Sequence, residues 1–310
     1  MDLTLVLVSL LLSLSIIIFS HKFYLSKKIF DKANARSSHN VIATRSGGVA
    51  TFMTLFIVSL TNYIIGNTLF DYSILIPLGI LVAVGSYDDL YNVDFKLKFI
   101  FQIIAAKMII DTGLLIDNFH GIMGLYEINR IFAQILTIFI IVSIINAINF
   151  IDGVDGLAIS IVSIFIILFQ YFSIDNTPYF NVSLILFSSI LPLYYFNFKK
   201  KRKVFLGDAG THFLGGLVSI YVIYILSNDY IIEPKFDLHK VLFVFSILSY
   251  PIIDLIRVFF LRIKNGKSPF VADKNHIHHI INYKVGSHLA VTSLISFSTI
   301  IIMLAIQFVF

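Results

Sequence analysis

Long apolar stretches separated by short polar gaps run along the whole chain. An α-helix needs about 20 mostly apolar residues to cross the hydrocarbon core of a bilayer. Ten stretches approach that length, with ends uncertain by a few residues: 3–20, 48–66, 69–87, 96–112, 130–150, 155–173, 179–196, 211–227, 241–261 and 288–308. The fourth is the least apolar, because it contains Lys96, Lys98 and Lys107. The pattern predicts an all-α, polytopic membrane protein with about ten transmembrane helices in a single domain, residues 1–310.

Lysine and arginine separate between the two sides that ten spans define. Residues 21–47, 197–210 and 262–287 hold most of the basic side chains, whereas the gaps on the opposite side hold only Lys235 and Lys240. Because basic loops remain in the cytoplasm, the first set is predicted to be cytoplasmic and both termini outside. The first apolar stretch is predicted to be a span and not a cleaved signal peptide, since its basic residues follow the apolar core.

Composition supports a membrane environment and narrows the chemistry. Of the 310 residues, 58% are hydrophobic and 13% are charged, whereas a soluble domain has about 25% charged residues. The chain has no cysteine, which excludes disulfides, cysteine metal ligands and cysteine nucleophiles.

Polar clusters fall in five of the predicted cytoplasmic segments, namely 36–39, 88–89, 146–156, 207–210 and 276–279. Such residues are costly near a membrane. Their occurrence on one side predicts a composite site at the cytoplasmic surface.

The adjacent carboxylates Asp88 and Asp89 end the third predicted span. Two like charges this close repel each other, so a cation or a shared proton must offset them. Lys96 and Lys98 follow at a spacing that suits a phosphate approaching from the carboxylate side. The alternative is a helix end followed by a solvated loop.

The segment 146–158 carries the most informative polar pattern. Asn146, Asn149 and Asp152 are spaced i, i+3 and i+6 and are predicted to share one helix face. Two Asp-Gly pairs then break the helix, because glycine permits positive φ. Carboxamide and carboxylate oxygens suit Mg²⁺. The alternative is a polar turn between two spans.

Asp208 lies between two glycines, just before an apolar span and after a run of five basic residues. Its carboxylate is a candidate to complete a metal site with Asn149. The basic run on its own is more typical of a topology signal than of a binding site.

Three histidines lie within residues 276–279. Zinc is one interpretation, but without cysteine or metalloprotease spacing it is weak. Imidazoles among basic residues fit pyrophosphate binding better. Asp254 and Arg257 are spaced i, i+3 and can simply pair with each other, and His212 can be a satisfied core residue.

Together these motifs resemble those of the polyprenyl-phosphate N-acetylhexosamine-1-phosphate transferases of glycosyltransferase family 4, which are related to the phospho-muramoyl-pentapeptide transferases. The resemblance extends from Asp31 to His279 in the family's order. The matching segments are 34–39, 45–48, 88–90 with 96–98 and Gln102, 146–158, 205–210, and 268–270 with Asp273 and 276–279. The chain departs from the family with Ala33 in place of proline, Ala43 to Ser46 in place of a Thr-Pro-Arg-Gly sequence, and Asp94-Phe95 in place of Ser-Pro.

The resemblance implies catalytic and metal-binding roles for four residues. Asp88, Asp89 and Asp208 would be catalytic, and the first two would position or deprotonate the lipid phosphate. Asn149 and Asp208 would hold Mg²⁺, with Mn²⁺ as an alternative, against the pyrophosphate of a UDP-sugar.

The resemblance also implies substrate contacts. Phe205 would stack on uracil, with Asp155 at its polar edge. Arg262 and the three histidines would contact the sugar phosphates, namely His276, His278 and His279. The other substrate-binding positions are Asn34, Arg36, Ser38, His39, Arg45, Lys96, Asn146 and Asp152.

The implied reaction moves a sugar 1-phosphate from a UDP-N-acetylhexosamine to polyprenyl phosphate and releases UMP, either by direct attack or through an aspartyl-phosphate. The expected partners are these two substrates and membrane lipid, with no nucleic acid, and a homodimer is compatible with the family. The expected location is the bacterial inner membrane, with the site on the cytoplasmic face. A polytopic transporter or flippase is the alternative, although such proteins tend to show mid-span charges and an internal repeat.

Overall fold

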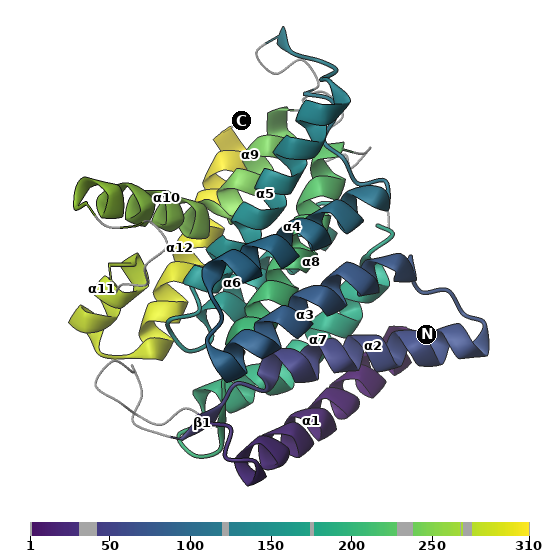
Figure 1. Cartoon of the computed structure of the whole chain (residues 1–310), viewed down its shortest axis with the longest axis vertical. Helices are drawn as coiled ribbons and strands as arrows, with labels where there is room; N and C mark the ends of the chain where they lie inside the picture. The colour runs from purple at the N-terminus through teal and green to yellow at the C-terminus, as the bar shows by residue number, and fades with distance from the viewer. Residues whose placement is uncertain are drawn as a thin grey trace. The chain divides into compact units, whose positions relative to one another are not determined.

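The structure is a computed structural model. It describes residues 2–30, 42–119, 124–173, 177–227, 238–266, 268 and 275–309. These residues are mostly helical (Figure 1), as the apolar pattern predicts. They form two compact units, of which the first comprises residues 1–105 and 175–214 and the second comprises 106–174 and 215–310.

The first unit is built around four packed helices. Helix α1 packs against α2 and α7, and α2 also packs against α3 and α7 (Figure 1). The elements of this unit, including one 3₁₀ helix η1, are α1 (Asp2–Ser26), β1 (Ala43–Thr44), α2 (Gly47–Ile65), η1 (Tyr72–Ile74), α3 (Leu75–Tyr91), α4 (Phe95–Asp111) as far as residue 105, α7 (Phe180–Phe198), β2 (Lys203–Val204) and α8 (Gly207–Ser227) as far as residue 214.

A short parallel ladder brings the starts of α2 and α8 together. Strands β1 and β2 pair with Ala43 opposite Lys203. The backbone N–H groups of Gly47 and Gly48 then donate to the carbonyl oxygens of Phe205 and Leu206, at 3.0 and 2.8 Å. These bonds satisfy amides that the first turn of a helix leaves without an internal partner.

Two glycines let helices approach the start of α8 closely. A Cβ atom on Gly48 would lie 2.1 Å from the backbone of Gly210, and one on Gly85 would lie 2.5 Å from the carbonyl oxygen of Asp208. Any side chain at either position would therefore push α2 or α3 away from α8. Helix α3 ends at Tyr91, and its C-cap residue Asn92 has a left-handed φ of 51°, a conformation that asparagine tolerates better than most residues. The last turn of α3 thus lies next to the first turn of α8.

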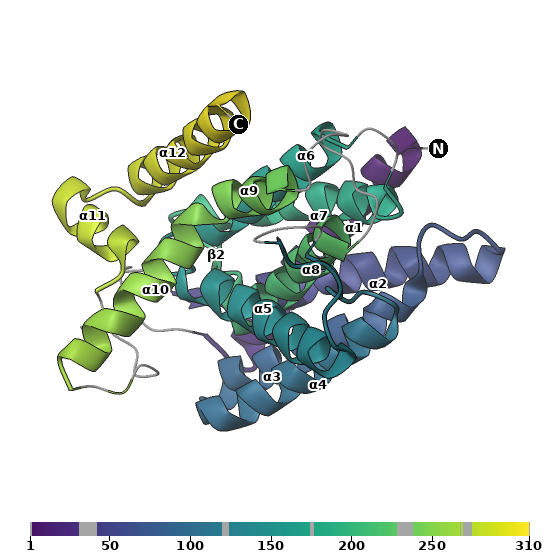
Figure 2. The ribbon, with the colours of Figure 1, turned by 90° about the horizontal axis from the view of Figure 1, so that it is seen from above.

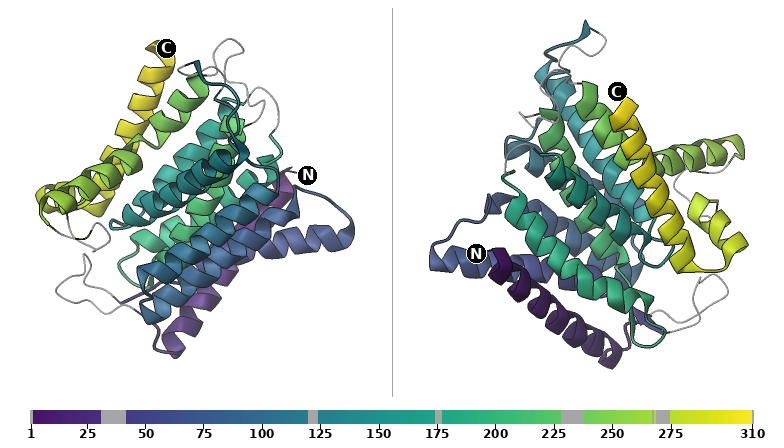
Figure 3. Two further views of the ribbon diagram at one scale, coloured as in Figure 1. Left: turned by 45° about the horizontal axis from the view of Figure 1, so that its top comes forward. Right: turned by 180° about the vertical axis from the view of Figure 1, so that it is seen from behind.

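The second unit contains the remaining helices, with α12 packed along α6 and α9 (Figure 3) and α10 packed on α5. Helix α11 directly precedes α12 and contacts it (Figure 2). Apart from the ends of α4 and α8, the helices of this unit are α5 (Arg130–Phe150), α6 (Leu157–Tyr171), α9 (Leu238–Ile247), α10 (Ser249–Lys264), α11 (Ile277–Val285) and α12 (His288–Val309).

Seven helices of the described residues are long and apolar enough to cross a membrane, and the chain is a multi-pass membrane protein. They are Leu3–Ser26, Gly47–Ile65, Tyr72–Tyr91, Arg130–Phe150, Phe180–Phe198, Gly207–Ser227 and His288–Gln307. The predicted span 241–261 is instead two helices, Lys240–Ile247 and Ser249–Lys264, which meet at a bend of 71° and raise the number to eight if they count as one span. The predicted spans 96–112 and 155–173 correspond to the shorter helices α4, of 17 residues, and α6, of 15 residues. The number of ten spans and the positions of the termini stay predictions.

Candidate active site

Two carboxylates of the first unit share one ammonium group. Asp88, in the last turn of α3, accepts a hydrogen bond from Lys98 Nζ at 2.7 Å, and Asp208, in the first turn of α8, lies 3.4 Å from the same Nζ. Asp88 also accepts from the backbone N–H of Val93 at 2.6 Å. The lysine supplies the positive charge that two converging carboxylates require.

The carboxylate of Asp89 binds the backbone at the start of α8. Its carboxylate accepts from the N–H groups of Asp208 and Ala209, at 3.0 and 3.1 Å, and its side chain is only 4% exposed. Arg45 lies 3.4 Å from the same carboxylate. A negative charge at a helix N-terminus interacts favourably with the unpaired amides and the helix dipole. Asp89, which lies on α3, therefore fixes the position of Asp208 on α8 relative to α3.

Of the described site residues predicted for the first unit, the structure brings together Arg45, Asp88, Asp89 and Asp208, with Lys98 in place of Lys96. Lys98 joins the carboxylates, whereas Lys96 is exposed on α4. Phe205 is half-buried, with Lys203 Nζ 5.3 Å from its ring centroid, and its backbone N–H donates to Thr44. The sequence does not distinguish Lys96 from Lys98, and only the rotation of α4 about its axis determines which lysine reaches the carboxylates.

His212 is a core residue, as one interpretation of the sequence has it. Its ring is buried, and Nδ1 lies 2.7 Å from the carbonyl oxygen of Asp208, one helical turn earlier. Nε2 has no hydrogen-bond partner among the described residues. The ring therefore helps to hold the backbone of Asp208, whose carboxylate faces Lys98.

The end of α5 differs from the prediction in one respect. The helix stops at Phe150, so Asn146 and Asn149 are on it, but Asp152 lies in the following turn, where its N–H donates to the carbonyl oxygen of Asn149 at 3.3 Å. The predicted common helix face for all three is therefore wrong, because the turn begins before Asp152. Asn146 donates from Nδ2 to the carbonyl oxygen of Val142 at 2.8 Å.

Asp155 is held by two residues that the sequence analysis missed, His288 and Thr292 of α12. His288 Nδ1 lies 2.8 Å from the carboxylate of Asp155, and the hydroxyl of Thr292 donates to its carbonyl oxygen at 2.7 Å. These contacts join residues more than 130 positions apart. No local pattern predicts them.

The histidine cluster of the second unit is centred on a buried carboxylate. Asp254 of α10 is fully buried and lies 2.7 Å from His276 Nδ1. It also pairs with Arg257 at 2.9 Å, which confirms the i, i+3 pairing that the sequence suggests. His276 Nε2 is 3.5 Å from a guanidinium nitrogen of Arg262, which is itself buried, with its charge over the ring of Phe150 at 5.9 Å.

His278 and His279 follow at the start of α11, with ring centroids 4.3 Å apart. The hydroxyl of Tyr250 is 2.9 Å from His278 Nδ1. Burial, the largest cause, lowers the pKa of His278 to about 3, so the ring is neutral at pH 7. Its Nε2 has no partner among the described residues, and a Cβ atom on Gly153 would lie 2.5 Å from it. Any side chain at residue 153 would therefore collide with this ring, and only glycine allows so close an approach.

Some predicted site residues and pairings stay predictions. Asn34, Arg36, Ser38 and His39 lie outside the described residues. Asn149 and Asp208 belong to different units, so their sharing of one metal stays a prediction. Among the residues that the structure describes, no three His, Asp or Glu side chains are grouped as a metal site. The weak zinc interpretation of the histidines thus gains no support.

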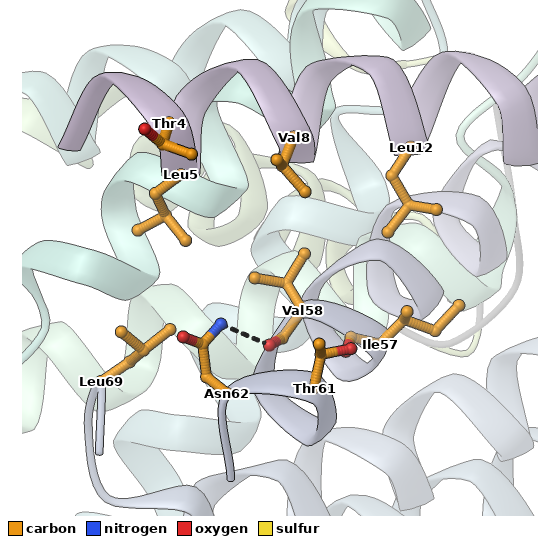
Figure 4. Close-up of a pocket in the computed structure, with 9 residues that line it drawn as sticks. All are labelled: Thr4, Leu5, Val8, Leu12, Ile57, Val58, Thr61, Asn62 and Leu69. Atoms are coloured by element: carbon orange, nitrogen blue, oxygen red, sulfur yellow. Dashed lines mark hydrogen bonds between the residues drawn. The ribbon is translucent and has the colours of Figure 1, made fainter. Parts of the chain in front are cut away.

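A separate cavity of about 270 Å³ lies between α1 and α2 (Figure 4). Its only polar side chains are two threonines and Asn62, whose Nδ2 donates to the carbonyl oxygen of Val58 at 2.9 Å. The lining residues are Thr4, Leu5, Val8, Leu12, Ile57, Val58, Thr61, Asn62 and Leu69. Without an ionisable side chain, this cavity lacks the groups that phosphoryl transfer requires.

Comparison with known proteins agrees with the chemistry of these clusters. The sequence model of glycosyl transferase family 4 matches residues 72–226, half of the chain. An undecaprenyl-phosphate α-N-acetylglucosaminyl 1-phosphate transferase of Haemophilus influenzae is 32% identical over 82% of this chain and 71% of its own length. The protein of the same name from Pasteurella multocida is 33% identical, with the same coverage of each chain. A probable undecaprenyl-phosphate N-acetylglucosaminyl 1-phosphate transferase of Bacillus subtilis is 31% identical over 80% of this chain and 68% of its own length.

Proposed function

Because this chain belongs to glycosyl transferase family 4, we propose that it transfers N-acetylhexosamine 1-phosphate from a UDP-sugar to undecaprenyl phosphate or a similar polyprenyl phosphate. The products are polyprenyl-pyrophosphoryl-N-acetylhexosamine and UMP. The reaction takes place at the cytoplasmic face of the bacterial inner membrane. The observation that carries the proposal is the convergence of Asp88 and Asp208 on Lys98 next to the capped start of α8.

The donor set of this cluster fits Mg²⁺, with Mn²⁺ as the alternative. Asp208 offers hard carboxylate oxygens, its side chain is 26% exposed, and Asp88 lies beside it. Mg²⁺ prefers such oxygens and is usually held by one or two carboxylates together with substrate phosphates. When bound, the metal supplies positive charge that neutralises the pyrophosphate of the donor. Asp208 would hold it, and Asn149 of the second unit is the other predicted ligand.

The bond changes of a direct attack balance without further reactants. An oxygen of the polyprenyl phosphate forms a bond to the β-phosphorus of the UDP-sugar, and the bond from that phosphorus to the bridging oxygen breaks, so this oxygen leaves with UMP. The carrier phosphate is already mostly ionised at pH 7, since its second pKa is about 6. A strong general base is therefore not needed.

Asp88 supports direct attack over an aspartyl-phosphate. Its two oxygens accept hydrogen bonds from Val93 and Lys98, at 2.6 and 2.7 Å, and such bonds stabilise the carboxylate and lower its nucleophilicity. Its role in this proposal is to hold Lys98 where the ammonium can meet a substrate phosphate. Lys98 thereby takes the phosphate-binding role that the resemblance implies for Lys96.

Residues of the second unit keep the substrate roles that the resemblance implies for them. Arg262 and His276, which contact each other, bind the phosphates of the donor. His278, whose buried Nε2 lies against Gly153, is the other histidine that we assign to the sugar phosphates. Asp155, held by His288 and Thr292, contacts the uracil edge.

The test is UMP release by purified protein in detergent, with undecaprenyl phosphate and a panel of UDP-N-acetylhexosamines. UMP should appear only when the carrier, one sugar donor and Mg²⁺ are all present, and EDTA should abolish it. Asp208→Ala should remove the activity, whereas the matched control Asp111→Ala, at an exposed ion pair on α4, should retain it. UMP release that needs no carrier, or that survives Asp208→Ala, contradicts the proposal.

A further inference from the structure

Asp254 is a fully buried carboxylate whose donors come from three different residues. It lies 2.7 Å from His276 Nδ1, accepts from the backbone N–H of Ile277 at 2.9 Å and pairs with Arg257 at 2.9 Å. A buried carboxylate is costly unless donors surround it, and here its partners satisfy both oxygens. Two of these partners lie on or next to α11, which carries the histidines of the candidate site.

The contact with His276 determines which ring nitrogen carries a proton. An ionised carboxylate only accepts hydrogen bonds, so the nitrogen that faces Asp254, Nδ1, carries the hydrogen. The other nitrogen, Nε2, faces the guanidinium of Arg262 at 3.5 Å, and a guanidinium only donates. One tautomer of the neutral ring makes both contacts, namely the one with its proton on Nδ1 and its lone pair on Nε2.

The same carboxylate also fixes the start of α11. Ile277 is the first residue of that helix, and its N–H has no partner within the helix. Arg257, bound to Asp254, additionally donates to the carbonyl oxygen of Asn275, just before His276. Asp254 therefore controls both the ring of His276 and the backbone on each side of it.

We propose that Asp254 is a positioning residue for the transfer reaction, which acts by holding His276 as the Nδ1-protonated tautomer and aiming Nε2 toward Arg262. This inference rests on the proposed function, because Arg262 and His276 are assigned to the donor phosphates there. The guanidinium then keeps its orientation through a ring that cannot turn. Asp254 itself is fully buried and acts through the ring and through the backbone that carries it.

Asp254→Asn tests this role because it keeps the size of the side chain and changes one acceptor into a donor. The amide oxygen can still accept from Ile277 N–H, and the amide NH₂ then faces His276 Nδ1. The ring must move its proton to Nε2 to accept that hydrogen bond. An N–H on Nε2 would then oppose the guanidinium of Arg262.

The experiment combines a structural and a kinetic measurement on the full-length protein in detergent. Histidine ring ¹⁵N chemical shifts distinguish a protonated nitrogen from one with a lone pair, and His276→Gln identifies the signals of this ring. We expect Nδ1 to be protonated in the wild type and Nε2 in Asp254→Asn. UMP release by Asp254→Asn should fall by about 100-fold, the order that misplacement of a substrate-positioning group produces. The control Asp111→Asn should retain wild-type turnover.

Any other pairing of the two results overturns the proposal. A changed tautomer with normal turnover means that the ring state does not matter, and lost turnover with an unchanged tautomer means that Asp254 acts by another route. If Asp254→Asn does not fold, the wild-type spectrum alone decides, because a proton on Nε2 is incompatible with the inferred contact. Absence of UMP release from wild-type protein with every donor would instead refute the proposed function, while the spectra would still report the Asp254–His276 contact.

Discussion

At the scale of single residues, the neighbouring aspartates Asp88 and Asp89 differ in what their carboxylates contact. Asp88 faces the ammonium of Lys98, whereas Asp89 faces the backbone of α8. Successive side chains on a helix point about 100° apart, so two adjacent carboxylates meet different neighbours. The sequence assigns both to catalysis, and the contacts favour a structural role for Asp89.

Replacement of Asp89 should therefore weaken the fold. Asp89→Ala leaves the amides of Asp208 and Ala209 without their acceptor, which should cost about 0.5–2 kcal/mol, the range for loss of a helix cap. Asp89→Asn keeps one acceptor oxygen and should cost less. Thermal unfolding in detergent, with Asp111→Ala as the control, measures both. If Asp89→Ala abolishes turnover but unfolds at the wild-type temperature, the residue is catalytic and not structural.

The neutral ring of His278 predicts a loss of stability in acid. Its pKa is about 3 in the folded protein and about 6.5 in an unfolded chain. Below about pH 6.5 the unfolded chain therefore binds a proton at this residue and the folded protein does not. The free energy of unfolding then falls by about 1.4 kcal/mol for each pH unit. Above pH 6.5 the two states carry the same charge at this site, so the effect vanishes.

Unfolding temperatures of the wild type and His278→Gln at pH 7.5, 6.5 and 5.5 measure this effect. The wild type should lose more stability than the variant between pH 6.5 and 5.5, and the two should respond alike between 7.5 and 6.5. Equal losses below pH 6.5 would show that His278 is accessible to protons in the folded state.

At the scale of helices, the site depends on how closely α3 approaches α8. Gly85 faces the backbone of Asp208, where an added Cβ would lie 2.5 Å from the carbonyl oxygen. Six residues earlier on the same helix, an added Cβ on Gly79 would meet only the ring edge of Phe52, at 3.5 Å. The two glycines therefore form a matched pair for testing this packing.

Gly85→Ala should destabilise the protein by about 1–3 kcal/mol, as overpacking does, and should reduce UMP release, because Asp208 must shift relative to Asp88. Gly79→Ala should be neutral or stabilising by about 0.5–1 kcal/mol, since alanine favours a helix interior over glycine. Unfolding temperature and turnover of the two variants test this. Equal behaviour of the pair would mean that α3 and α8 do not pack as closely as described.

At the scale of the whole molecule, the proposed function requires that the polar clusters face the cytoplasm. The chain has no cysteine, so single cysteines can be introduced and labelled without background. Lys201→Cys, in the basic segment after α7, should react with a membrane-impermeant maleimide only after the cells are permeabilised. Leu125→Cys, an exposed residue before α5, should react in intact cells. The reverse pattern would place the candidate site outside the cell, away from UDP-sugars.

The sequence by itself determined the helical membrane class and the position of most spans, and its motifs predict the residue types of the site. These properties depend on local apolar content and on short motifs, so they can be predicted from neighbouring residues. The break between α9 and α10 was not predicted, because the apolar run 241–261 continues through it.

Only the tertiary structure decided which residues meet. It placed Lys98, and not Lys96, beside Asp88, and it placed Asp89 against the backbone of α8. It also paired Asp155 with His288 and Asp254 with His276. Each of these contacts joins separate helices or the segments between them. It depends on the rotation and close packing of those helices, and no local sequence pattern encodes such an arrangement.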